Sequence, residues 1–229
     1  SYIGSDVPAI LKYTRDVYYI GNQEMARVRK GEITFYNLDG EEIEKELKTV
    51  EWDAEAAEKS GYEHFMIKEI HEQPKAVSDT LNSVIKDGMI DLSEVGLSEE
   101  EIKEISQIYI VACGSAYHVG VAAQYVMEDL ARIPVRVELA SEFRYRNPIL
   151  DPKGLVVIIS QSGETADSLA ALRESKKQGV KTLGIVNVIG SSIAREADNV
   201  YYTLAGPEIA VATTNAYSTQ LIAAYSLAI

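Results

Sequence analysis

The sequence predicts an α/β fold, a doubly wound five-stranded parallel sheet with flanking helices, preceded by a β-rich segment. Between residues 107 and 229, uninterrupted apolar runs alternate with helical spacing. Continuous apolar strands joined by helices are typical of a parallel sheet that is covered on both faces. The first 60 residues instead alternate aromatic and charged residues around glycines, as expected of an antiparallel meander with one solvated face.

The N-terminal segment predicts short strands joined by tight turns. An aromatic strand is expected over 16–20, followed by two strands over 25–29 and 33–37 that flank a hairpin turn at Gly31. A second turn is expected at Gly40, because Asp-Gly pairs favour tight hairpin turns.

A stretch rich in Glu, Lys and Ala follows and predicts helices. Helical spacing before Pro74 is expected to break at that proline, and a second helix is expected over 75–86, ended by Gly88. Ser98 and Glu101 form a capping-box pattern that opens a third, short helix.

Five strands are then expected in the parallel sheet. The helix after the first strand is the clearest, because its apolar residues form one stripe from Val119 to Leu130. Ligands of such sheets bind at the carboxyl ends of the strands, at a topological switch point. The expected strands are 108–112, 135–139, 155–159, 182–186 and 200–203.

The loop after the third of these strands, Ser-Gln-Ser-Gly-Glu-Thr at 160–165, contains three hydroxyl residues. Hydroxyls and backbone N–H groups at a helix N-terminus favour an anion site, most often for phosphate. Capping of the helix is the alternative, although one hydroxyl would suffice for that. No P-loop lysine follows, so a sugar monophosphate fits better than a nucleoside triphosphate.

Glycine and hydroxyl residues recur at the other strand ends, over 113–116, 187–192 and 210–215. Turns and caps explain each loop singly, but their recurrence at one edge of the sheet favours a ligand site. Several other polar side chains could act as a nucleophile, a base, a metal ligand or an anion contact, but a structural or solvated role explains each of them at least as well. They are Cys113, His118, His64, His71, Glu164, Arg144 and Arg146.

Composition narrows the function classes. The 229 residues carry a formal net charge of −13, which argues against a nucleic-acid partner. No apolar run is long enough to span a membrane, and no leader pattern opens the chain. The single cysteine, Cys113, excludes an internal disulfide and suits a cytoplasmic protein. The chain ends inside an apolar helical pattern, so we expect a fragment of a longer protein.

Five motifs in order resemble the glutamine–fructose-6-phosphate aminotransferases. They are Cys-Gly-Ser-Ala-Tyr-His at 113–118, Ala-Ser-Glu-Phe-Arg-Tyr-Arg at 140–146, Ser-Gln-Ser-Gly-Glu-Thr-Ala-Asp at 160–167, Asn-Val-Ile-Gly-Ser-Ser at 187–192 and Ala-Gly-Pro-Glu-Ile at 205–209. Residues 107–229 resemble the first sugar-isomerase (SIS) subdomain of that family, truncated at its C-terminal end. Residues 1–67 resemble the C-terminal part of its glutaminase domain, of the Ntn amidotransferase type, and residues 68–106 would form a helical connector.

The resemblance implies a role in converting fructose 6-phosphate and glutamine to glucosamine 6-phosphate and glutamate. It implies no cofactor, no metal and a homodimer. The glutaminase nucleophile and the isomerase base would lie outside this chain, so no catalytic residue is expected within it and the fragment alone would be inactive. The implied sugar-phosphate contacts are Ser160, Gln161, Ser162 and Thr165, with Cys113, Gly114, Ser115 and the backbone of Val211 at the sugar.

Two departures from the family pattern stand in the motifs. Ala116 replaces a hydroxyl residue, and Asn215 replaces a lysine. Three alternatives remain open: a SIS module that senses a phosphosugar, another SIS phosphosugar isomerase or deglycase, and a scaffold with a vestigial site. A sensing regulator would carry a basic helix-turn-helix at its N-terminus, where this chain has an acidic β-rich region.

Overall fold

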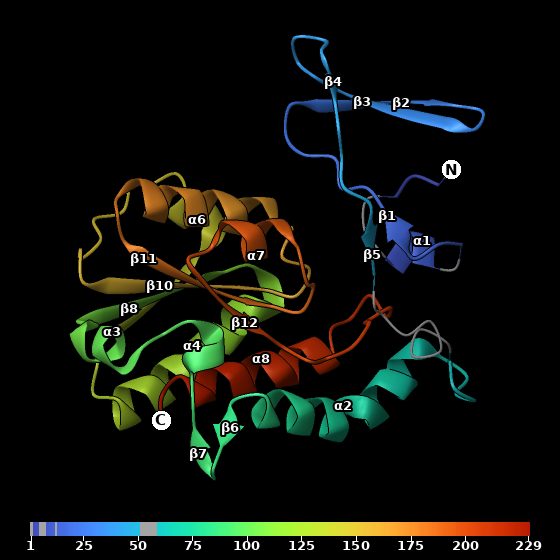
Figure 1. Ribbon diagram of the computed structural model, residues 1–229. Coiled ribbons are helices and arrows are strands. Elements are labelled where there is room, and N and C mark those ends of the chain that lie inside the picture. Colours follow the sequence, from blue (N-terminus) through green and yellow to red (C-terminus); the bar gives the residue numbers. More distant parts are fainter. Residues whose placement is uncertain (1, 5–7, 12, 51–58) are drawn as a thin grey trace. The chain divides into compact units, whose positions relative to one another are not determined.

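The computed structural model describes residues 2–4, 8–11, 13–50 and 59–229 (Figure 1). The chain forms two compact units, Ser1–Ser60 and Gly61–Ile229. The division falls at residues 60 and 61, ahead of the domain boundary predicted at 67 and 68, and the functional assignment of the domains stays a prediction.

The N-terminal unit is built from short antiparallel pairs. Strands β2 and β3 pair in register from Glu24↔Asn37 to Arg29↔Glu32, and Gly31 at their turn has φ +82°, a conformation that glycine adopts readily. The predicted hairpin is therefore confirmed, whereas the strand predicted over 16–20 is only two residues long. The elements are α1 (Pro8–Leu11), β1 (Asp16–Val17), β2 (Glu24–Arg29), β3 (Glu32–Asn37), β4 (Glu42–Ile43) and β5 (Lys48–Thr49).

The second unit contains the predicted parallel sheet, with strand order β12-β11-β10-β8-β9. Each of the five predicted strands is confirmed to within one residue at either end. The central strand, β10, is buried along its whole length. The strands are β8 (Gln107–Ala112), β9 (Val135–Leu139), β10 (Gly154–Ser160), β11 (Lys181–Val186) and β12 (Asn199–Tyr202).

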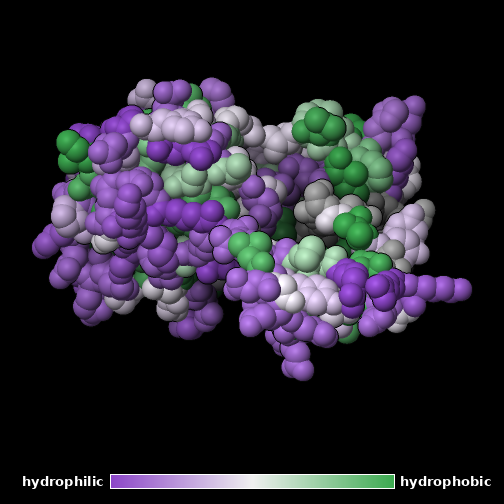
Figure 2. Space-filling view, turned by 90° about the horizontal axis from the view of Figure 1, so that it is seen from above, coloured by the Kyte–Doolittle hydropathy of each residue, from purple (hydrophilic) through white to green (hydrophobic). Residues whose placement is uncertain are grey.

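Alternate residues of β10 face two separate apolar clusters, one on each side of the sheet. Val157 belongs to a cluster with residues of α4 and α8, and Val156 and Ile158 belong to one with residues of α5, α6 and α7 (Figure 1). Helix α2 packs along α8. The outer surface over α6 and α7 is mostly hydrophilic (Figure 2). The helices are α2 (Phe65–Asn82), α4 (Gly114–Leu130), α5 (Ala140–Phe143), α6 (Ala166–Lys177), α7 (Ser192–Glu196) and α8 (Asn215–Ser226).

Two predictions before the sheet were wrong. Helix α2 runs through Pro74 without ending. Proline removes one backbone hydrogen bond, but the carbonyl of Ile70 accepts one from the side chain of Gln73 at 3.4 Å, and α2 packs along α8. The helix then ends at Asn82, and Gly88 lies in the turn of a hairpin formed by β6 (Ile85–Lys86) and β7 (Met89–Ile90).

The predicted capping box is confirmed at the start of α3 (Glu99–Glu104), which follows the 3-10 turn η1 (Ser93–Val95). The hydroxyl of Ser98 accepts from the backbone N–H of Glu101, and the Glu101 carboxylate accepts from the backbone N–H of Ser98 at 2.9 Å. The same carboxylate accepts a hydrogen bond from Lys181 of β11. Glu101 therefore links α3 to strand β11 of the sheet.

This contact predicts a specific loss of stability in acid. The hydrogen bond from Lys181, followed by those from Ser98, lowers the pKa of Glu101 from 4.5 to about 2. Since the folded pKa lies below the unfolded one, the contribution of the carboxylate to stability is present above pH 4.5 and is lost as the pH falls toward 2. In urea unfolding between pH 6 and pH 3, Glu101→Gln should flatten the decline in stability relative to the wild type. Glu100→Gln, on the same helix, should not; equal slopes for Glu101→Gln and the wild type would contradict the assignment.

Candidate functional site

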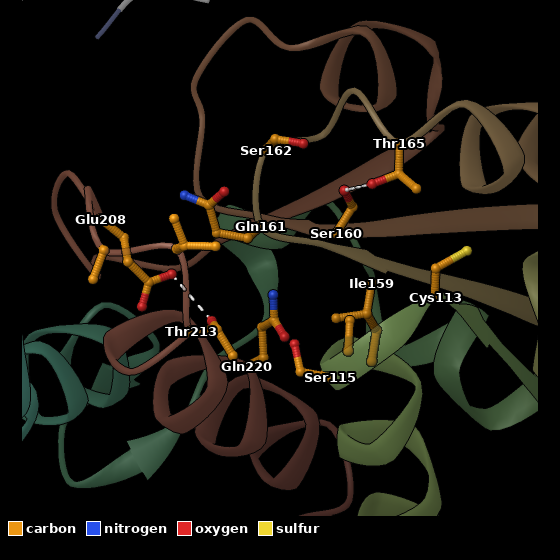
Figure 3. A pocket seen from close by; sticks show the side chains of 13 residues that line it. Cys113, Ser115, Ile159, Ser160, Gln161, Ser162, Thr165, Glu208, Thr213 and Gln220 are labelled. Carbon is orange, nitrogen blue, oxygen red and sulfur yellow. Dashed lines mark hydrogen bonds between the residues drawn. The ribbon is translucent and has the colours of Figure 1, made fainter. Parts of the chain in front are cut away.

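A pocket of about 280 Å³ lies at the carboxyl ends of β8 and β10 (Figure 3). The chain runs from β8 outward to β9 and then returns to β10 on the other side of β8, so this is the switch point at which such sheets bind ligands. The register Ile159↔Ala112 places the two following loops side by side. The pocket is lined by Cys113, Ser115, Ala116, Ile159, Ser160, Gln161, Ser162, Thr165, Glu208, Ala210, Val211, Thr213 and Gln220.

The structure thus brings together seven of the eight predicted site residues. The exception is Gly114, the first residue of α4, which has φ +58° and is not among the lining residues. The positive φ indicates that glycine is needed here for the turn of the backbone. The roles of the seven as ligands stay a prediction.

Hydroxyl groups hold the loop after β10 in its shape. Ser160 Oγ accepts from the backbone N–H of Gly163 at 3.1 Å and lies 2.9 Å from Thr165 Oγ1. Ser162 Oγ accepts from the backbone N–H of Glu164 at 3.2 Å. Thr165 is the N-cap residue of α6, yet its side chain makes no capping hydrogen bond. Its hydroxyl faces Ser160 across the loop (Figure 3), so capping does not account for this threonine.

The third strand-end loop, 187–192, supports this turn, and its residues are not among those that line the pocket. The backbone N–H of Asn187 donates to the carbonyl of Gln161 at 3.1 Å. The backbone N–H of Ser192 donates to the Glu164 carboxylate at 2.7 Å. The loop at 187–192 therefore contacts the loop at 160–165, and the Glu164 carboxylate is engaged in that contact.

The segment between β12 and α8 closes the remaining side of the pocket. Glu208 accepts hydrogen bonds from Thr213 Oγ1 at 3.1 Å and from the backbone N–H groups of Thr214 at 2.5 Å and Ala216 at 3.2 Å. This carboxylate therefore caps α8, because it satisfies N–H groups that the helix leaves without an internal partner. Val211 is fully exposed and lies at the rim of the pocket.

Glu208 and Gln220 line the pocket but were not predicted as site residues. Glu208 lies inside a quoted motif, but its role depends on a loop that folds back onto the start of α8. Gln220 is only 3% exposed; a glutamine on the apolar face of a helix was the signal that could have found it. Of the two departures from the family pattern, Ala116 lines the pocket and Asn215 does not.

The described lining of the pocket offers an anion neutral hydrogen-bond donors and no cationic side chain. Among its lining residues, all of which the structure describes, none is Lys or Arg and one is a carboxylate. Arg144 instead pairs with Asp167 at 2.7 Å, and the hydrogen bond between them raises the pKa of the guanidinium. Arg146 pairs with Glu138. An anion here would be held by hydroxyls, backbone N–H groups and the N-terminus of α6.

Within the described ranges, no cluster of three or more His, Cys, Asp and Glu side chains could hold a metal ion. His71 stacks on Tyr62 with ring centroids 5.3 Å apart, and His118 packs edge-on against Tyr117. None of the helices in this part of the chain combines the length and apolar character that a membrane crossing needs.

A parallel sheet with a hydroxyl-lined pocket at its switch point defines an α/β ligand-binding domain. The family model described as SIS domain matches residues 101–229, and the chain belongs to the SIS domain family. This confirms the fold class predicted from the strands.

Relatives with curated names match the whole chain. It is 58% identical over 228 residues to a glutamine–fructose-6-phosphate aminotransferase (isomerizing) of Clostridium acetobutylicum, and 56% identical over 230 residues to one of Caldanaerobacter subterraneus subsp. tengcongensis. These alignments cover 99% and 100% of this chain, which spans 38% of the length of each relative.

A solved structure is similar as well. The C-terminal domain of glucosamine-fructose-6-phosphate aminotransferase from Francisella tularensis superposes with a TM-score of 0.71 at 46% identity. The match covers 75% of this chain and 48% of that structure. The resemblance stated from the five motifs is thereby confirmed.

Proposed function

We propose that this chain is part of a glutamine–fructose-6-phosphate aminotransferase, in which it provides loops that bind the sugar phosphate. The observation that carries the proposal is the hydroxyl-lined pocket at the switch point, in a chain that aligns with enzymes of that name over its whole length. The protein that contains it would convert fructose 6-phosphate and glutamine to glucosamine 6-phosphate and glutamate.

Within the pocket, Ser160, Gln161, Ser162 and Thr165 would hold the phosphate. Three hydroxyls around one turn and the N-terminus of α6 support this assignment. The sugar would lie against Cys113, Gly114, Ser115 and the backbone of Val211, on the neighbouring loops.

The domain assignment is part of the same proposal. Residues 1–67 would be the C-terminal part of a glutaminase domain, 68–106 a connector and 107–229 the first SIS subdomain. The pocket supports binding more than proton transfer, because its one carboxylate, Glu208, is engaged in capping α8. Glutamine hydrolysis and isomerisation would then fall to other parts of the longer protein, which we propose to be a cytoplasmic homodimer.

Calorimetric titration of this chain tests the binding role. Fructose 6-phosphate and glucosamine 6-phosphate should bind, whereas unphosphorylated fructose, the matched ligand, should bind far more weakly because the phosphate contacts are missing. Ser162→Ala should weaken binding of both phosphorylated sugars by about tenfold, the effect of one hydrogen bond to a charged group. Equal affinity for fructose and fructose 6-phosphate would refute the phosphate loop.

The whole-protein activity needs its own assay. The full-length protein should form glucosamine 6-phosphate from fructose 6-phosphate only when glutamine is supplied. Binding of the sugar phosphate without any amine transfer would instead support a phosphosugar-sensing module.

A further inference from the structure

Glu69 is a buried carboxylate outside the pocket. It lies on α2, in the second turn of that helix, and is only 1% exposed. Burying a carboxylate is costly unless hydrogen bonds satisfy it. Its position therefore depends on the groups that donate to it.

Three hydrogen-bond donors to Glu69 come from the loop between β12 and α8. One oxygen accepts from the backbone N–H groups of Ile209 at 2.7 Å and Ala210 at 2.9 Å. The other accepts from Thr214 Oγ1 at 3.0 Å. These donors lie at both ends of the segment that places Ala210, Val211 and Thr213 around the pocket, so one side chain of α2 fixes both ends of that segment.

A second carboxylate meets the same threonine. Glu208 Oε1 lies 3.1 Å from Thr214 Oγ1. The hydroxyl of Thr214 carries one hydrogen, so it donates fully to only one of the two carboxylates. An amide at residue 69 could donate to the threonine oxygen and leave that hydrogen for Glu208.

We propose that Glu69 is a positioning residue for the phosphosugar site: it holds the loop 209–214 so that its backbone and Thr213 meet the ligand. This inference rests on the proposed function. Glu69 does not line the pocket, and it acts through the three hydrogen bonds to the loop. Removing the carboxylate would leave the N–H groups of Ile209 and Ala210 without this acceptor, which favours a different loop conformation.

Four variants of this chain test the proposal, with two readouts. Glu69→Ala should raise the Kd for glucosamine 6-phosphate by about tenfold, as expected for lost charged hydrogen bonds. It should also speed hydrogen exchange at the amides of Ile209 and Ala210. Glu69→Gln should restore both readouts, since its carbonyl oxygen accepts from the two amides and its NH₂ group donates to Thr214.

Gln73→Ala is the matched control. Gln73 lies one turn further along α2 and accepts a hydrogen bond from Ser218 of α8 instead of from the loop. Neither the Kd nor the exchange at residues 209 and 210 should change in this variant. If Glu69→Ala does not fold, Thr214→Val, which removes one of the three bonds, should still raise the Kd in the same direction.

The outcomes separate this inference from the proposed function. If the unmodified chain binds no sugar phosphate, the proposed function fails, while hydrogen exchange still reports whether Glu69 holds the loop. If the chain binds but Glu69→Ala, or Thr214→Val in its place, binds as tightly, the positioning role is overturned. A Glu69→Gln variant as impaired as Glu69→Ala would also overturn it, because the hydrogen-bond pattern would then not explain the effect.

Discussion

Replacing Gly163 by alanine should destabilise the C-terminal unit by about 3 kcal/mol and abolish phosphosugar binding. Gly163 has φ +65°, and a Cβ added there would lie 2.0 Å from Ser191 Oγ and 2.5 Å from Ser191 Cβ. Ser191 belongs to the supporting loop and is buried, so neither side can move without distorting the turn. Urea unfolding and calorimetric titration measure the two effects.

A second glycine separates the two causes of this loss. Gly179, in the same unit, has φ +75° but nothing within 4 Å of an added Cβ. Gly179→Ala should therefore cost only the backbone strain of about 1–2 kcal/mol. A Gly163→Ala variant no less stable than Gly179→Ala would show that contact with Ser191 contributes nothing.

Removing the obstacle should recover part of the loss. Within the described residues, Ser191 Oγ is buried and has no hydrogen-bond partner, so Ser191→Ala alone should be nearly neutral. The double variant Gly163→Ala with Ser191→Gly should regain the steric part and keep the backbone strain. A double variant whose loss equals the sum of the losses in Gly163→Ala and Ser191→Gly would contradict the proposed contact.

The sheet could be predicted because its strands and the loops that follow them can be recognised from consecutive residues. The central strand β10, which is buried along its whole length, is an apolar run from Leu155 to Ile159. Hydroxyl and glycine residues after such runs could be placed at one edge of the sheet, since parallel strands share that edge. The same reasoning found the loops around the pocket from neighbouring residues alone.

The remaining features depend on partners distant in the sequence. Helix α2 continues through Pro74 because α8 packs along it, nearly 150 residues later in the chain. The sequence gives no sign that Glu69 differs from other helical glutamates, because the N–H groups of Ile209 and Ala210 that donate to it lie far along the chain. The loop at 187–192 has the glycine and hydroxyl residues expected of a loop that binds a ligand. Its contacts with Gln161 and Glu164 show that it supports the neighbouring loop at 160–165.

Replacing Thr165 by alanine should weaken phosphosugar binding by about 10- to 100-fold, which decides between the capping and the ligand interpretations of this loop. A hydrogen bond to a charged group contributes about 1.5–3 kcal/mol, and each 1.4 kcal/mol changes affinity tenfold. Thr165 makes no capping bond, so stability should fall by only about 1 kcal/mol, through the lost contact with Ser160.

Ser98→Ala is the control for Thr165→Ala, because Ser98 is a true cap with a reciprocal bond to Glu101. Its loss should also cost about 1 kcal/mol of stability. The two variants are then matched in unfolding free energy, and calorimetric titration with glucosamine 6-phosphate should separate them: Ser98→Ala should bind like the wild type and Thr165→Ala should not. Thr165→Ser, which keeps the hydroxyl, should restore affinity. If Thr165→Ala and Ser98→Ala bound alike, the hydroxyl at residue 165 would have no role in the ligand site, and the anion would have to be held by the other side chains of the loop and by backbone N–H groups.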